Sequence, residues 1–343
     1  MPIVQPLRLK GAPGSPYTRK MLAYLRYRRI SYEFMIGDQT ADELGFPRPK
    51  VGLLPTFYLP NDEGEIEAVV DSTPLIRRFE EAFVGRETLP TNPVLGFINY
   101  LIEDYADEWL TKSMFHYRWY YDPDIKKAAS ILPLWRGLQM DDEQHQKAAA
   151  FVSDRQISRL YVVGSNDVTA PIIEASYRRF LEIMDGLIAR QPYVLGSRPS
   201  SADFGIYAQL TQLAKFDPTP MNICLEEAPR LYAWADVVDD LSGHACEEDG
   251  WMSVSDVREV LGPILSEIGR VYAPALIANA RALQAGEKQM ETIIDGKSWE
   301  QPSFPYQGKC LAWINDEYKK LSLEVRGQVN DILAGTSCEE MLR

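Results

Sequence analysis

The first 85 or so residues of this chain alternate between strand-like and helix-like segments, and this alternation limits the possible folds more than any other feature. Short apolar runs bounded by glycine, proline or asparagine are typical of strands, whereas apolar residues spaced three and four apart are typical of a helix. The expected strands are residues 7–10, 31–36, 56–59 and 66–70, and the expected helices are residues 16–28, 73–83 and, at most as a short helix, 40–45. The order β-α-β-(α)-β-β-α predicts an α/β domain within residues 1–86.

The pattern changes after residues 87–93, which have the composition of a linker. Beyond it the apolar spacing predicts almost only helices, at residues 94–120, 141–162, 170–190, 201–215 and 229–242. We therefore expect an all-helical domain over residues 94–244.

The last hundred residues have an organisation of their own. The expected elements are a helix from residue 257 that Pro263 and Pro274 should kink or divide, a hairpin at residues 290–301 around an Asp295–Gly296 turn, and a helix at residues 306–334. Both helices carry an apolar stripe, and such stripes do not stay exposed to water. We therefore expect residues 245–343 to form a C-terminal extension that packs on the helical domain.

Charge and cysteine content narrow the function classes. The chain has 49 acidic and 36 basic residues and a formal net charge of −13, so nucleic acid and anionic membranes are not expected as partners. No run approaches the ~20 apolar residues of a membrane span, and the N-terminus lacks a signal-peptide pattern. The four cysteines form no C-x-x-C pair and the three histidines lie far apart, which predicts a reduced cytoplasmic protein without a metal site.

Four short motifs follow one another on the expected elements. They are GAPGSPYTRK at residues 11–20, LLPT at 53–56, DSTP at 71–74 and LGSRPSSADF at 195–204. The first resembles the S-P-[FY]-x-x-[RK] turn of serine-type glutathione S-transferases, and the second resembles their V-P-x segment with its cis-proline. The third is similar to their [ED]-S loop and the fourth to the S-x-A-D box of their second domain. Over about residues 6–242 the chain thus resembles this family, including its bacterial members.

The resemblance implies a thioredoxin-like domain that binds glutathione, followed by a helical domain of the kind found in glutathione S-transferases. It implies an enzyme that uses glutathione as co-substrate and directs its thiolate at an apolar electrophile, by conjugation or by glutathione-dependent bond cleavage. A homodimer without a metal is also implied. The alternative, from a different class, is a non-catalytic protein of this fold that binds or assembles with a partner.

Ser15 is the expected catalytic residue. A free thiol with a pKa of ~8.5 is mostly protonated at neutral pH, and a hydroxyl that donates to the sulfur at a helix N-terminus favours the thiolate. Tyr17 is the second candidate donor. Both residues have a purely structural alternative, since Ser15 fits the N-cap of the first helix and Tyr17 fits as a packed aromatic in its first turn. The SPYT sequence has oxygen at both sulfur positions of a glutaredoxin C-P-Y-C motif, which argues against disulfide exchange.

The expected contacts to glutathione come from Leu54, Pro55, Asp71, Ser72, Lys50 and Arg19. By resemblance, the peptide group before the cis-proline would pair with the cysteinyl part. The acidic residue and the serine would hold the γ-glutamyl end at the N-terminus of a helix. One of the two cations would pair with the remaining carboxylate, because Leu53 stands where relatives usually place Lys or Gln.

The acceptor substrate is expected to lie against the first helix of the helical domain. Its candidate wall is the aromatic stripe Tyr105, Trp109, Phe115, His116 and Trp119. Small-molecule pockets commonly combine apolar walls with a few polar groups, but an aromatic stripe at helical spacing fits core packing equally well. The acidic residues Asp104, Asp107 and Glu108 of the same helix are expected to form a solvated face.

Overall fold

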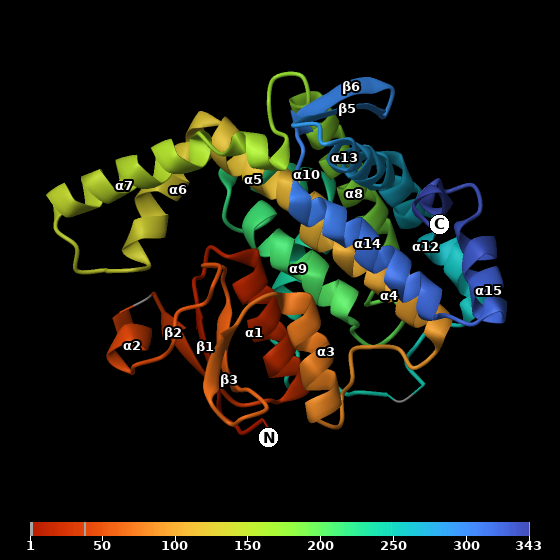
Figure 1. Cartoon of the computed structure of the whole chain (residues 1–343), viewed down its shortest axis with the longest axis horizontal. Coiled ribbons are helices and arrows are strands. Elements are labelled where there is room, and N and C mark those ends of the chain that lie inside the picture. The colour runs from red at the N-terminus through yellow and green to blue at the C-terminus, as the bar shows by residue number, and fades with distance from the viewer. Residues whose placement is uncertain (1–2, 38, 248, 343) are drawn as a thin grey trace.

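The computed structural model describes residues 3–37, 39–247 and 249–342 of the chain. Its N-terminal part is a four-stranded sheet in the order β2-β1-β3-β4 (Figure 1). The strands are β1 (Leu7–Gly11), β2 (Tyr32–Ile36), β3 (Thr56–Pro60) and β4 (Ile66–Val69). Strand β1 pairs with β2 in parallel and with β3 in antiparallel, so that Leu9 lies between Phe34 and Phe57. The predicted α/β fold class is confirmed.

Three helices accompany this sheet: α1 (Pro16–Arg28), α2 (Gln39–Glu43) and α3 (Ser72–Ala82). Ten of the thirteen side chains of α1 are buried, more than the single apolar face of an ordinary amphipathic helix accounts for. The reason is that α1 lies between the sheet and the helical domain, where it packs along α9. Polar groups on α1 are therefore buried as well, among them Thr18 and Lys20.

The helical domain begins with one long helical segment that corresponds to the predicted helix 94–120. It consists of α4 (Pro93–Tyr105), the π-helical turn η1 (Ala106–Leu110) and α5 (Thr111–Tyr120). The other predicted helices are present as α7 (Asp142–Ile157), α8 (Ala170–Ile188), α9 (Ser201–Leu213) and α11 (Pro229–Val238). Helix α9 begins with a capping box, in which Asp203 Oδ2 accepts from the Ser200 N–H at 2.8 Å.

Two helices of this domain are not expected from the sequence pattern: α6 (Asp122–Leu134) and α10 (Pro218–Glu227). Helix α6 starts directly after α5, where the extended backbone of Tyr121 changes the chain direction. Together with α7 it extends away from the body of the molecule (Figure 1). A short 3₁₀ segment, η2 (Leu160–Val163), leads back to α8.

The C-terminal extension packs on the helical domain, with α12 against α8 and with α14 and α15 against α4. Its elements are η3 (Val254–Asp256), α12 (Val257–Glu267), η4 (Ile268–Tyr272), α13 (Ala273–Ala285), β5 (Gln289–Ile294), β6 (Lys297–Pro302), α14 (Pro305–Lys320), α15 (Leu323–Leu333) and η5 (Cys338–Met341). The hairpin prediction is confirmed. The expectation of one final helix is wrong, because the Ser322 hydroxyl caps a new helix by accepting from the Val325 N–H. Pro263 lies inside α12 and does not end that helix, and Pro274 lies in the first turn of α13; a kink at these residues stays a prediction.

The continuous helical stretch Val254–Ala285 is long and apolar enough to cross a membrane by length and composition alone, although no such run of apolar residues is expected from the sequence. Within its most apolar window, 61% is buried inside the chain. Leu261, Leu265 and Ile268 belong to the same buried cluster as the side chains of α1 and α4. The stretch therefore packs as a core helix. The domain boundaries at residues 86, 94 and 244 stay a prediction.

Candidate active site

Ser15 lies between β1 and α1 and is the N-cap of α1. Its Oγ accepts from the Thr18 N–H at 3.2 Å and lies 3.4 Å from the carbonyl oxygen of Leu54. Pro16 occupies the first helical position, where its fixed φ suits the helix and no N–H is missed. The hydroxyl thus stands at the positive end of the α1 dipole, a position that favours an anion.

The loop that carries Ser15 is held in place by the helical domain. Arg118 of α5 donates to the carbonyl oxygen of Gly14 at 3.2 Å, and Gln212 of α9 donates to that of Pro13 at 3.2 Å. Arg118 also donates to Gln212 at 2.7 Å and forms a buried ion pair with Asp217 at 2.8 Å. No local sequence pattern predicts these contacts, because about a hundred or more positions separate Arg118 and Gln212 from the loop.

The peptide bond between Leu54 and Pro55 is cis, as expected. Pro55 directly precedes β3, so this bond lies at the start of a central strand of the sheet, next to the Ser15 loop. Among the described residues the Leu54 N–H has no hydrogen-bond partner. This group remains available to a ligand that binds beside Ser15.

Asp71 and Ser72 lie at the N-terminus of α3. Asp71 has a φ of +82°, a left-handed conformation that a non-glycine residue adopts at a cost and that often marks a functional site. Its Oδ2 accepts from the Tyr306 hydroxyl at 3.2 Å. Burial raises the pKa of the Asp71 carboxyl, and the nearby Lys20 opposes this shift. The Ser72 hydroxyl has no partner within the described part of the chain, so both residues present polar groups at a helix N-terminus.

A buried ionic cluster fixes α1 against the helical domain. The ammonium group of Lys20 lies 2.7 Å from Glu103 Oε1 and 2.5 Å from Asp107 Oδ2. The Thr73 hydroxyl lies 3.2 Å from both carboxylates, and the Ser201 hydroxyl donates to Glu103 at 2.6 Å. Burial alone would lower the pKa of Lys20, but the two carboxylates raise it. The cluster therefore connects α1, α3, α4, η1 and α9 directly behind the candidate site.

The expectation of a solvated acidic face on this helix is wrong. Asp107 is only 6% exposed, and Asp104 accepts a 2.6 Å hydrogen bond from Tyr272 of the C-terminal extension. Burial and the neighbouring carboxylates raise the pKa of Asp104 to about 7 and that of Glu108 well above its usual range. The Glu108 carboxylate has no hydrogen bond or ion pair among the described residues. The spacing of acidic residues along a helix does not predict which other elements pack against it, and here α1 and α14 cover this face.

The raised pKa of Asp104 predicts a pH dependence of stability. In the folded chain Asp104 takes up its proton below about pH 7, whereas the unfolded chain does so near its ordinary value of 3.8. Its contribution to stability is therefore lost as the pH rises from about 4 to about 7. Asp104→Asn should be more stable than the wild type at pH 8, by on the order of 1–3 kcal/mol, and this advantage should vanish near pH 4. Urea unfolding at several pH values measures the difference.

Asp167 provides a matched control, since it accepts a 2.8 Å hydrogen bond from Tyr120 at the surface. Asp167→Asn should leave the pH dependence of the free energy of unfolding unchanged. An Asp104→Asn variant that is equally stabilised, or equally destabilised, at pH 4 and pH 8 would contradict the assignment.

The expectation of an aromatic acceptor wall is wrong for four of its five residues. Tyr105 and Trp109 are fully buried, and Trp109 donates to Ser176 of α8 at 2.8 Å and packs on Trp299 of β6. Trp119 is also buried, whereas Phe115 is only partly buried against it. The stripe faces α8 and the C-terminal extension, so it forms core.

His116 also belongs to this core. It is fully buried, with Nδ1 at 2.8 Å from the Ser165 hydroxyl and Nε2 at 3.3 Å from Glu174 Oε1. Both ring nitrogens are thus engaged within the helical domain, away from Ser15. A role of His116 as an acceptor-site residue is not supported by this position.

Tyr17 takes the structural alternative that the sequence left open. Its hydroxyl donates to the carbonyl oxygen of Asp107 at 2.7 Å and lies 2.8 Å from the Thr111 hydroxyl. Burial and the carboxylates of Glu108 and Asp107 raise the pKa of Tyr17 well above its usual range. Ser15 therefore remains the better candidate for a hydroxyl that contacts a bound thiol.

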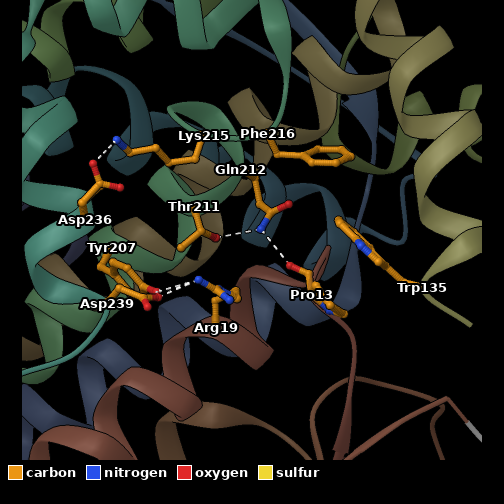
Figure 2. Close-up of a pocket in the computed structure, with 11 residues that line it drawn as sticks. Pro13, Arg19, Trp135, Tyr207, Thr211, Gln212, Lys215, Phe216, Asp236 and Asp239 are labelled. Carbon is orange, nitrogen blue, oxygen red and sulfur yellow. Dashed lines mark hydrogen bonds and ion pairs between the residues drawn. The ribbon is translucent and has the colours of Figure 1, made fainter. Parts of the chain in front are cut away.

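Lys50 and Arg19, the two cations expected to pair with the remaining carboxylate of glutathione, lie in different surroundings. Lys50 is exposed in the loop before β3. Arg19 points to the other side of α1, where it forms a 2.6 Å ion pair with Asp239 and donates to Tyr207 at 3.3 Å (Figure 2). The expectation for Arg19 is not supported by this geometry, because its charge is already paired on the α9 side of the helix.

Arg19 instead lines an open pocket of about 380 Å³ between the Ser15 loop, α9 and α11. The pocket has aromatic walls from Trp135, Tyr207 and Phe216, and Pro13 forms part of its rim (Figure 2). Within residues 3–37, 39–247 and 249–342, no three His, Cys, Asp or Glu side chains converge as a metal site would require.

The comparisons with known proteins relate this fold to one family. Residues 9–87 match the N-terminal domain of the glutathione S-transferases, and residues 149–236 match their C-terminal domain. The chain belongs to the glutathione S-transferase family. No curated protein sequence matches it.

Solved structures of the family are similar to the chain at low identity. A glutathione S-transferase from Rhodospirillum rubrum F11 is 16% identical, with 72% of this chain and 96% of that chain covered and a TM-score of 0.41. A family member from Pseudomonas fluorescens Pf-5 with bound glutathione is 16% identical, with coverages of 68% and 93% and a TM-score of 0.38. A homologue from Lodderomyces elongisporus with two glutathione molecules per subunit is 17% identical, with the same coverages and a TM-score of 0.37.

Proposed function

We propose that this protein is a glutathione transferase in which the Ser15 hydroxyl stabilises the thiolate of bound glutathione. The observation that carries the proposal is the position of Ser15 Oγ, at the N-terminus of α1 and 3.4 Å from the Leu54 carbonyl oxygen that precedes the cis-proline. Asp71 and Ser72 offer polar groups at a second helix N-terminus. The cysteinyl part of glutathione would lie beside Leu54, with its γ-glutamyl end at α3.

The chemistry needs few groups from the protein. The thiol proton leaves to solvent, and the Ser15 hydroxyl turns from the Leu54 carbonyl to donate to the sulfur. A hydrogen bond to a charged group contributes roughly 1.5–3 kcal/mol, which lowers the thiol pKa by about one to two units. The thiolate then attacks an electrophilic carbon, and a new carbon–sulfur bond forms as a leaving group departs or a double bond takes up the electron pair.

The open pocket beside Pro13 is the better candidate for the acceptor, in place of the buried aromatic stripe. Pro13, which forms part of its rim, precedes Ser15 by two positions in the chain, and three aromatic rings line the pocket. Trp135→Ala should raise the KM for an aromatic electrophile about three- to tenfold and leave the KM for glutathione within twofold, as the loss of one apolar contact predicts. Steady-state kinetics with each substrate varied in turn tests this. An equal change in both KM values would contradict the assignment.

The proposal as a whole is tested by titration calorimetry with glutathione and by turnover with a generic aryl electrophile. We expect binding together with measurable conjugation. Binding without turnover would favour the non-catalytic alternative, and a protein that does not bind glutathione would contradict the proposed function.

A further inference from the structure

The C-terminal extension reaches the candidate glutathione site through Tyr306, at the start of α14. The Tyr306 hydroxyl donates to Asp71 Oδ2 at 3.2 Å, although 235 positions separate the two residues. The start of α14 is anchored, because Asn279 of α13 is fully buried and exchanges two hydrogen bonds with the backbone of Phe304, at 2.7 and 2.9 Å. The Tyr306 ring packs edge-on against Trp313, so its position is set by the extension.

The surroundings of this contact favour a positive charge. Burial raises the pKa of Tyr306, and the carboxylates of Glu108 and Asp71 raise it further. The carboxylate of Asp71 also contributes to the raised pKa of Glu108. Lys20 lowers the pKa of Asp71, but its ammonium group is already paired with Glu103 and Asp107. A ligand ammonium group beside Asp71 would therefore favour the ionised carboxylate, which burial disfavours.

We propose that the C-terminal extension completes the glutathione site, with Tyr306 as a positioning residue that holds Asp71 to bind the α-ammonium group of the γ-glutamyl end. This inference rests on the proposed function. Tyr306 does not touch the reacting sulfur. The extension, which the family domains at residues 9–87 and 149–236 do not include, thereby contributes to ligand affinity as well as to packing.

Calorimetry with two ligands tests the inference: glutathione itself, and the analogue in which the γ-glutamyl α-amino group is replaced by hydrogen. Tyr306→Phe should raise the Kd for glutathione about five- to tenfold, with kcat within twofold of the wild type. The analogue should bind the wild type and the variant equally, because it has no ammonium group for Asp71. An equal loss for both ligands, or no loss for glutathione, would overturn the proposal.

Tyr318→Phe is the matched control, since Tyr318 lies on the same helix and donates to Asn330 at 2.8 Å, away from Asp71. It should leave both Kd values unchanged. If Tyr306→Phe does not fold, Asp71→Asn provides the second test, because it removes the negative charge and keeps an acceptor for the Tyr306 hydroxyl. Asp71→Asn should raise the Kd for glutathione by a similar factor and leave the Kd for the analogue unchanged. If the wild type binds glutathione and both variants bind it with the same Kd, the result would contradict this inference and leave the proposed function intact.

Discussion

Ser15→Ala is expected to lower kcat/KM for conjugation about 10- to 100-fold. The variant removes the hydroxyl that donates to the sulfur, and a charge-assisted hydrogen bond of roughly 1.5–3 kcal/mol corresponds to a factor of this size. Ser15 also caps α1 by accepting from the Thr18 N–H, so a loss of stability of about 1 kcal/mol should accompany the loss of activity. Steady-state kinetics with glutathione and an aryl electrophile, together with urea unfolding, separate the two effects.

Tyr17→Phe is the control for this prediction. It removes a hydroxyl that is bound to Asp107 and Thr111. It should reduce stability and leave kcat within about threefold of the wild type, since a hydroxyl that lies outside the reaction contributes no transition-state stabilisation. A wild-type rate for Ser15→Ala, or a larger rate loss for Tyr17→Phe, would show that the sulfur contact is assigned to the wrong hydroxyl.

Lys20→Met is expected to destabilise the folded chain by about 3–5 kcal/mol, because two buried carboxylates lose their cation. The side chains of Lys20 and Glu103 are fully buried, and that of Asp107 is 8% exposed. The loss should shrink as the pH falls, since protonation removes the unpaired negative charges. Urea unfolding of both proteins at several pH values measures this.

The control is Lys147→Met, which removes a surface ion pair with Glu143 whose side chains are 74% and 78% exposed. It should change the free energy of unfolding by less than about 0.5 kcal/mol. If Lys20→Met costs as little as Lys147→Met, the buried cluster does not hold α1 against the helical domain.

Sequence alone predicts the features that have a local cause. The alternation of strands and helices, the Ser15 cap and the hairpin at Asp295–Gly296 each depend on a few neighbouring residues, and the structure contains all of them. The cis bond before Pro55 followed from the resemblance to a family. These features define the α/β domain and one side of the candidate site.

The other side of the site depends on contacts that no local pattern encodes. Lys20 meets Glu103 and Asp107 across 83 and 87 positions, so the spacing of the carboxylates alone suggested a solvated face. Trp109 faces β6 of the extension and not a substrate pocket. The contact between Tyr306 and Asp71 depends on how the extension packs, and a pattern of apolar spacing predicts that packing occurs without predicting which side chains meet.

The central claim is that Ser15 keeps the sulfur of bound glutathione anionic, and the pKa of that thiol tests it most directly. Ultraviolet absorbance of the thiolate, measured against pH in the binary complex, reports this value for the wild type and for Ser15→Ala. We expect a pKa about one to two units below the ~8.5 of a free thiol in the wild type, and a return to the free value in Ser15→Ala. A free-thiol pKa in the wild-type complex, or the same lowered pKa in both proteins, would contradict the account.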